Sequence, residues 1–182
     1  MAVATGTHRL GPGDGSLQIK TYREGMASKA GHDLVFDVAQ WDATLVVAED
    51  GGASTLELNA DPRSLQVREG VGGMKPLTDK DRADIRKNID EKVLGGQAIT
   101  FRSSAVELDG EGSRLSVQGE LTMAGSAAPV SAELAVEPGG HVAATVALTQ
   151  SDWGIKPYKG LMGALKVRDS LEVVFDGHVP SR

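Results

Sequence analysis

Apolar and polar residues alternate with a period of two along most of the chain, as they do in strands that bury one face. The apolar positions of these runs are, in chain order, Leu17 and Ile19; Leu56 and Leu58; Leu65 and Val67; Ile99 and Phe101; Leu115, Val117, Leu121 and Met123; Val130, Leu134 and Val136; Val142, Ala144, Val146 and Leu148; and Leu171, Val173 and Phe175. Glycine-rich turns at 50–52, 109–112 and 138–140 connect such runs as in antiparallel hairpins. The pattern predicts an all-β barrel or sandwich of eight to ten strands.

One segment departs from the alternation and predicts a helix over about 78–94. Thr78 and Asp81 have the spacing of a capping box, in which each side chain pairs with the other residue's backbone. A narrow apolar stripe with a spacing of four residues follows: Ile85, Ile89 and Val93. A helix with one apolar stripe can cover an edge or an end of a barrel, but it is too narrow for a helical bundle.

Composition and charge narrow the class of protein. The 182 residues are 40% hydrophobic and 24% charged, which is ordinary for a globular chain and predicts one domain over 1–182. The net charge of −6 makes nucleic acid an improbable partner. The absence of cysteine removes disulfides and every Cys-ligated zinc site. The longest aliphatic run, Leu45–Ala48, is far below the roughly 20 residues of a membrane span, so we expect no stable membrane insertion.

The N-terminal residues Met1–Thr7 carry neither a basic region nor an apolar one. They therefore predict a cytoplasmic protein. An exported protein whose leader has been removed would show the same N-terminus, so that alternative stays open.

Sequence motifs for catalysis or cofactors are weak. The glycine-rich segments 11–15 and 70–75 lack the spacing and following residues of nucleotide-binding loops. The four histidines are scattered, and we predict neither a metal nor a cofactor. Ser28, His32 and Asp33 form the only nominal triad, but in a strand Ser28 and His32 would lie roughly 13 Å apart.

Several local motifs, in this order, resemble the YceI-like family of lipocalin-like proteins, in the branch with a Gly-His-Asp-Leu motif. That motif stands at Gly31–Leu34 and is followed by Trp41–Thr44. The further matching segments are the helix from Leu77 with Ile99–Ser104, Gly119–Gly125 with Pro129-Val130, Ser151–Ile155, and Met162–Val167. Together they cover the chain from Leu17 to Val179.

The resemblance implies an elongated eight-stranded antiparallel lipocalin-like barrel with one helical insertion. It also implies an interior pocket for a long amphiphile such as a polyisoprenoid, an isoprenoid quinone or a fatty-acid derivative. Many relatives are exported, whereas Met1–Thr7 shows no leader. The expected partner is thus a small amphiphilic lipid or quinone, and a homodimer remains an open alternative.

The inward positions of the runs predict the wall of such a pocket: Phe101, Val130, Leu134, Val146 and Leu148. Two regions compete for the polar end of the ligand. One is the segment 151–168, an expected irregular loop that contains Trp153, Lys156, Tyr158 and Met162. The other is the pair His32 and Asp33.

We therefore expect a non-enzymatic carrier or sequestering protein. Two alternatives remain. One is an enzyme that acts on an isoprenoid-type ligand with His32 and Asp33. The other is an interaction barrel whose Val, Leu and Ile side chains fill the interior as a solid core.

Overall fold

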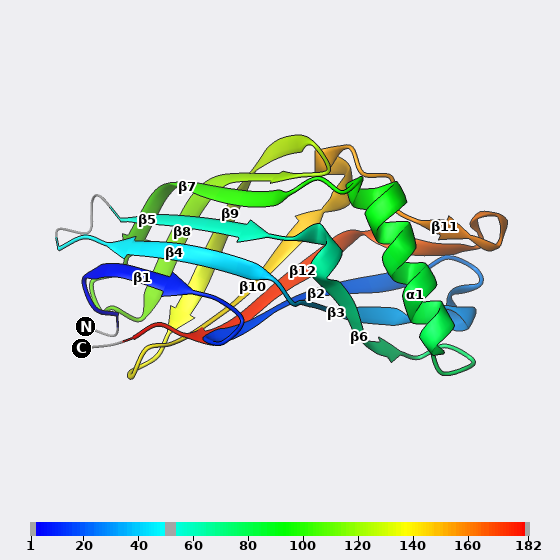
Figure 1. Ribbon diagram of the computed structural model, residues 1–182, viewed down its shortest axis with the longest axis horizontal. Coiled ribbons are helices and arrows are strands. Elements are labelled where there is room, and N and C mark those ends of the chain that lie inside the picture. The colour runs from blue at the N-terminus through cyan, green and yellow to red at the C-terminus, as the bar shows by residue number, and fades with distance from the viewer. Residues whose placement is uncertain (1–2, 50–53, 181–182) are drawn as a thin grey trace.

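The computed structural model, which describes residues 3–49 and 54–180, is an antiparallel sheet that curls into a barrel, with a helix near one end (Figure 1). Its strands are β1 (Gly6–Leu10), β2 (Gly15–Glu24), β3 (Asp33–Val38), β4 (Trp41–Val47), β5 (Thr55–Ala60), β6 (Leu65–Val71), β7 (Ile99–Leu108), β8 (Arg114–Met123), β9 (Ser126–Val136), β10 (His141–Thr149), β11 (Lys159–Gly160) and β12 (Leu165–His178). The helical elements are α1 (Asp79–Asn88), the π-helix η3 (Ile89–Leu94), and the 3-10 turns η1 (Ser28–Ala30), η2 (Pro62–Ser64), η4 (Gln150–Trp153) and η5 (Leu161–Gly163).

The all-β, antiparallel prediction is confirmed, but the predicted count of eight strands is wrong. The described residues form twelve, because the eight alternating runs correspond to β2, β5 to β10 and β12, and β1, β3, β4 and β11 are additional. Residues 39–40 separate β3 from β4, and η2 separates β5 from β6. Pro62 begins η2 and has no N–H to donate to a ladder, while the Asp61 carboxylate accepts from the Arg63 N–H. The strand ends there for that reason.

Strands β3 and β4 form a long hairpin with β5 and β6, and this hairpin lets the sheet return on itself. β3 pairs with β2 and with β6, whereas β5 pairs with β4 and with β7. One end of the hairpin therefore borders β2, and the other end borders β7. From β7 to β12 the order β7-β8-β9-β10-β12 is a meander, consistent with the hairpin turns predicted at 109–112 and 138–140, and β12 then pairs with β2.

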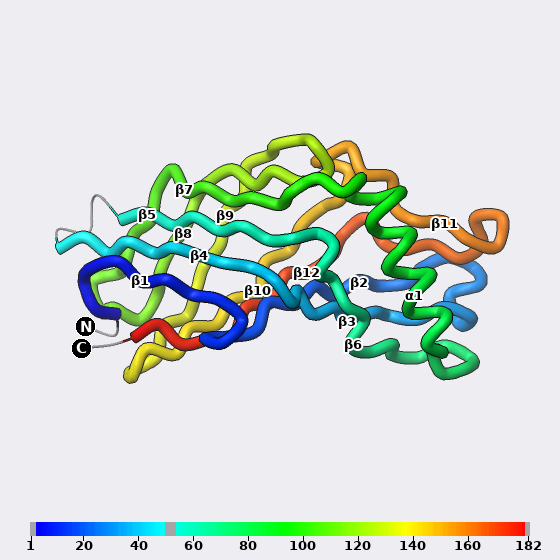
Figure 2. Tube along the Cα trace, in the orientation of Figure 1, coloured from blue at the N-terminus to red at the C-terminus, as the bar shows by residue number. Residues whose placement is uncertain are grey.

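The two ends of the barrel differ (Figures 1 and 2). Both termini lie at the end away from α1, where Val3 and Val179 are each 2% exposed. At the opposite end α1 packs against β6. No helix in the described ranges 3–49 and 54–180 is long and apolar enough to cross a membrane.

The helix forms as its sequence predicts. The Thr78 hydroxyl accepts from the Asp81 N–H and the Asp81 carboxylate accepts from the Thr78 N–H, so the capping box is complete. The Thr78 N–H and the Thr78 hydroxyl both donate to the Asp81 carboxylate, and they hold the pKa of Asp81 below its usual value. The predicted stripe packs against the core: Ile85, Ile89 and Val93. Gly95 ends the helical segment with a φ of 59°.

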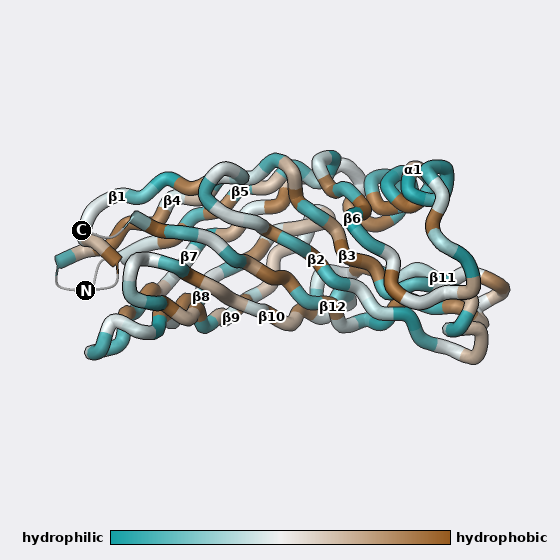
Figure 3. Tube along the Cα trace, turned by 90° about the horizontal axis from the view of Figure 1, so that it is seen from below, coloured by the Kyte–Doolittle hydropathy of each residue, from teal (hydrophilic) through white to brown (hydrophobic). Residues whose placement is uncertain are grey.

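Hydrophobic and hydrophilic positions alternate along the strands in Figure 3. The register agrees with the predicted parity, since Val146 faces Val173 and Leu148 faces Leu171 across β10 and β12. The turns at 109–112 and 138–140 connect consecutive strands as predicted. The turn predicted at 50–52 lies outside the described residues.

Gly119 interrupts the inward row of β8 and makes room for an aromatic ring. A Cβ at this position would fall 2.6 Å from the Phe101 ring and against the carbonyl oxygen of Arg102. Gly119→Ala should therefore lower the free energy of unfolding by about 1–3 kcal/mol. Gly110→Ala, where a Cβ meets nothing within 4 Å, should change it by less than about 0.5 kcal/mol. Urea unfolding of the two variants checks this, and equal effects would contradict it.

Candidate functional site

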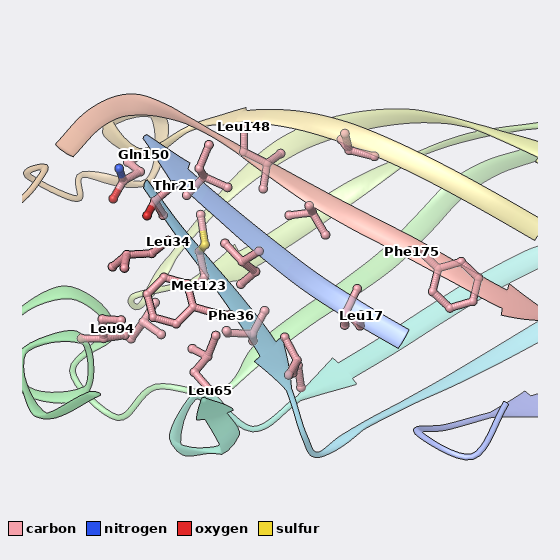
Figure 4. A pocket seen from close by; sticks show the side chains of 18 of the residues that line it. Leu17, Thr21, Leu34, Phe36, Leu65, Leu94, Met123, Leu148, Gln150 and Phe175 are labelled. Atoms are coloured by element: carbon pink, nitrogen blue, oxygen red, sulfur yellow. The ribbon is translucent and has the colours of Figure 1, made fainter. Parts of the chain in front are cut away.

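The curled sheet encloses a cavity of about 850 Å³. Its wall is made by the inward faces of the barrel strands together with the apolar stripe of α1 and η3. Figure 4 shows that side chains from several strands point into this space, from Leu17 and Phe175 at one end to Thr21 and Gln150 at the other. The volume lies within the range of roughly 300–1,000 Å³ that small-molecule sites usually have.

The five apolar residues predicted for the pocket wall all line this cavity: Phe101, Val130, Leu134, Val146 and Leu148. Period two brings them together, because every second side chain of β7, β9 and β10 faces the interior. The filled-core alternative expected these residues to pack against one another. The enclosed volume shows that they leave a large space between them.

The cavity is lined mainly by apolar side chains and opens at the α1 end, where Tyr158 is 46% exposed. Contact between this wall and an apolar chain removes apolar surface of both partners from water, which is favourable. The wall therefore suits an apolar molecule that can enter from the α1 end.

The Gly-His-Asp-Leu motif lies at the α1 end of the cavity. His32 lines the cavity, and its Nε2 donates to the Lys75 carbonyl at 2.8 Å, which ties the start of β3 to the connection between β6 and α1. Asp33 is not among the lining residues. Its carboxylate accepts from the Arg23 N–H at 2.9 Å and lies 3.8 Å from Arg23 Nε.

Ser28 does not lie in a strand, contrary to our expectation, because residues 28–30 form the 3-10 turn η1. His32 and Asp33 have different partners, Lys75 and Arg23, so the structure shows no hydrogen bond that links the members of the nominal triad. In the part of the chain that the structure describes, no group of three or more His, Asp or Glu side chains is arranged to hold a metal ion.

The segment 151–168 is less irregular than predicted, because β12 already begins at Leu165. Its candidate residues are not brought together. Trp153 is buried outside the cavity and its indole N–H donates to the Leu121 carbonyl at 2.7 Å. Tyr158 lines the cavity and is 46% exposed, whereas Lys156 and Met162 are exposed and do not line it.

Several polar residues of the wall lie just beyond the predicted apolar runs. Thr21 and Arg23 line the cavity and continue the parity of Leu17 and Ile19 along β2. Gln150 likewise continues the parity of Val146 and Leu148, and its amide donates to the Arg168 carbonyl at 2.8 Å. The period-two signal could have found them if the runs had been extended past the last apolar residue.

Trp41 is a further residue of the wall that lies outside the alternating apolar runs. Its ring lies edge-on to Phe175 with the ring centroids 5.9 Å apart, and both line the cavity. Its indole N–H is buried without a hydrogen-bond partner among the described residues. Trp41 is therefore a spectroscopic reporter placed at the cavity itself.

Comparisons with known proteins identify the fold. The profile of the family described as YceI-like domain matches residues 18–179. The crystal structure of BcnA from Burkholderia cenocepacia is similar, with a TM-score of 0.63, 14% identity, and coverage of 89% of this chain and 94% of its own. No curated protein sequence matches the chain.

Two further solved structures share the fold. The Campylobacter jejuni YCEI protein has a TM-score of 0.54 and 9% identity, with 79% of this chain and 82% of its own covered. A polyisoprenoid binding domain from Saccharophagus degradans, implicated in plant cell wall breakdown, has a TM-score of 0.55 and 9% identity, with 97% and 100% covered. At these identities the similarity shows a common architecture.

A pair of alanines tests whether the cavity is open space. Ala144 lines the cavity, whereas Ala128 is 9% exposed and packs in the cluster with Met123 and Trp153. Ala144→Phe should cost less than about 1 kcal/mol, since the ring can enter the cavity. Ala128→Phe should overpack and cost about 1–3 kcal/mol. Thermal and urea unfolding measure both, and an Ala144→Phe loss as large as that of Ala128→Phe would indicate a filled core.

Proposed function

The chain belongs to the YceI-like domain family, as its motifs predicted, and we propose that its barrel binds one long-chain amphiphile for carriage or sequestration. The ligand class is a polyisoprenoid, an isoprenoid quinone or a fatty-acid derivative. The polyisoprenoid binding domain from Saccharophagus degradans, which has the same fold, supports this class. The observation that carries the proposal is the apolar cavity of about 850 Å³.

The apolar chain of the ligand contacts the strand residues of the wall. Phe101, Val130, Leu134, Val146 and Leu148 provide this surface, and each buried CH₂ contributes about 0.8 kcal/mol. A chain of many methylenes or isoprene units therefore gains enough to offset the loss of its freedom on binding. The interior also needs no specific polar contact along most of its length.

The polar end of the ligand lies at the α1 end of the cavity. Tyr158, the guanidinium of Arg23 and the second N–H of the Gln150 amide offer donors there, and Tyr158 reaches solvent. His32 lines the same end but donates its Nε2–H to the Lys75 carbonyl. A buried polar group without a partner costs several kcal/mol, so the head group remains near these donors or near water. Asp33 supports the wall through its hydrogen bond with Arg23, and Trp153 supports it through its hydrogen bond with Leu121. Lys156 and Met162 do not line the cavity.

The partners of His32 and Asp33 favour binding over catalysis. The imidazole holds a backbone carbonyl and the carboxylate holds the Arg23 backbone and side chain, so both residues fix the architecture of the cavity end. A catalytic imidazole is usually oriented by a carboxylate, whereas here the Lys75 carbonyl holds His32 and Arg23 engages Asp33. We accordingly propose a carrier without enzymatic activity.

A fluorescence titration tests whether a ligand binds in the cavity. The protein carries Trp153→Phe, so that Trp41 is its sole tryptophan. Geranylgeraniol should change the fluorescence of Trp41 in a saturable way, since Trp41 lines the cavity. Ala144→Phe in this background should weaken binding roughly tenfold or more, equivalent to about 1.4 kcal/mol. An organic extract of the purified protein, analysed by mass spectrometry, should contain a long-chain amphiphile. Binding that Ala144→Phe leaves unchanged would place the ligand elsewhere.

His32→Gln separates the carrier from the enzyme. Glutamine can still donate to the Lys75 carbonyl but does not titrate as imidazole does. The affinity for geranylgeraniol should change by less than about fivefold, or roughly 1 kcal/mol. Chromatography of the ligand after incubation should recover it unaltered with both proteins. Turnover by the unaltered protein that falls roughly 100-fold or more in the variant would establish the enzyme instead.

A further inference from the structure

The most exposed large hydrophobic side chains gather at one end of the barrel. Among the described residues these are Met26, Val71, Met74, Tyr158, Leu161 and Met162. Val71 is the last residue of β6, and the other five lie in three loops, 25–32, 72–78 and 154–164, which we call the mouth loops. All three lie at the α1 end of the molecule (Figure 1).

Hydrogen bonds join the mouth loops into one surface. The Ala27 N–H donates to the Ala164 carbonyl at 2.9 Å, which links the first loop to the third. His32 Nε2 donates to the Lys75 carbonyl at 2.8 Å, which links the first loop to the second. Met74 and Tyr158 line the cavity as well, so this surface surrounds the end where the cavity opens.

The charge of the mouth loops is opposite to that of the chain. They contain Lys29, Lys75, Lys156 and Lys159 and no Asp or Glu, although the net charge of the chain is −6. All four lysines are exposed, and none has a carboxylate within ion-pair distance in the described part of the chain. The nearest acidic residues along the chain border the loops: Asp33 pairs with Arg23, Asp79 begins α1, and Glu24 and Asp152 are exposed beside the first and third loops.

The backbone at the tip of the third loop is costly. Leu161 and Met162 have φ angles of 48° and 58°, a left-handed conformation that Asn and Gly adopt far more readily. Their side chains are 60% and 107% exposed, so packing within the protein does not compensate for the conformation. The turn thus presents two large apolar side chains to the surroundings of the protein at a conformational cost.

We propose that the mouth loops dock on the surface of an anionic lipid layer. Exposed Met, Leu and Tyr side chains can enter the boundary between head groups and acyl chains, while the lysines remain at the level of the anionic head groups. The excess negative charge on the remainder of the chain orients the mouth toward the lipid. Docking in this orientation would let a ligand pass between lipid and cavity, but the docking itself does not depend on which ligand the cavity holds.

Vesicle co-sedimentation tests the proposal with the extracted, ligand-free full chain. The vesicles are phosphatidylcholine with about a quarter phosphatidylserine, compared with phosphatidylcholine alone. We expect binding to the anionic vesicles at low ionic strength that falls several-fold at high salt, as the surface charges are screened. Equal binding to both vesicles, or none to the anionic ones, would overturn the proposal.

Two double variants locate the contact. Leu161→Asn with Met162→Gly suits the left-handed turn, so the fold should be at least as stable while vesicle binding falls roughly tenfold or more. Lys156→Glu with Lys159→Glu should weaken binding at low salt to a similar degree. The control is Arg9→Glu with Arg114→Glu, which makes the same charge change on exposed positions of β1 and β8 and should bind nearly as the unaltered protein does. Because Arg114→Glu also removes the surface ion pair with Glu133, urea unfolding checks that this control remains folded.

Unaltered binding by both mouth variants would place the lipid contact elsewhere and overturn the proposal. Sedimentation velocity without vesicles measures the oligomeric state, because a second copy of the chain could cover the mouth loops instead of lipid. A dimer that Leu161→Asn with Met162→Gly dissociates, together with no vesicle binding, would show that the mouth loops are a subunit interface. The geranylgeraniol titration of each variant reports on the cavity separately, so loss of docking and loss of ligand binding are distinguishable.

Discussion

The enclosed cavity depends on the bend in the hairpin formed by β3–β4 and β5–β6. Ser64 holds this bend: its hydroxyl accepts from the Gln40 N–H at 2.9 Å and donates to the Asp61 carbonyl at 2.8 Å, and its carbonyl accepts from the Ala39 N–H. Ser64 is 8% exposed, so these bonds satisfy polar groups that would otherwise be buried without partners. With the hairpin bent here, β3 reaches β2 and β5 reaches β7, and the sheet returns on itself.

The closure of the sheet explains why the interior is hollow. A curled sheet of long strands fixes the distance across the barrel through its backbone hydrogen bonds, and side chains of modest size cannot span that distance. Only seven residues of the chain are aromatic, and Trp41, Phe101 and Phe175 line part of the wall without filling the space. The far end is closed by Val3 and Val179, whereas the α1 end carries the polar donors and the mouth loops.

The Gly-His-Asp-Leu motif connects the polar donors and the mouth loops at the α1 end. Gly31 lies against Leu165, His32 holds the Lys75 carbonyl, and Asp33 holds Arg23, so one short segment joins β2, β12 and the connection from β6 to α1. The same contacts position the cavity opening and the loops that we propose to meet lipid. A binding protein for a water-insoluble ligand benefits from this arrangement, because the ligand can enter without exposure of its apolar chain to water.

The sequence by itself determined eight of the strands, the helix and the faces that point inward. Period two identified Val146, Leu148, Leu171 and Val173 as one face, and the capping box at Thr78 and Asp81 located the helix, because both signals are local. Only the tertiary structure decided that β1, β3, β4 and β11 join the sheet, that Trp153 is buried while Met162 is exposed, and that His32 meets Lys75. Alternation tells which side of a strand a residue faces, but the curvature of the sheet and the contacts between distant loops determine what lies on that side.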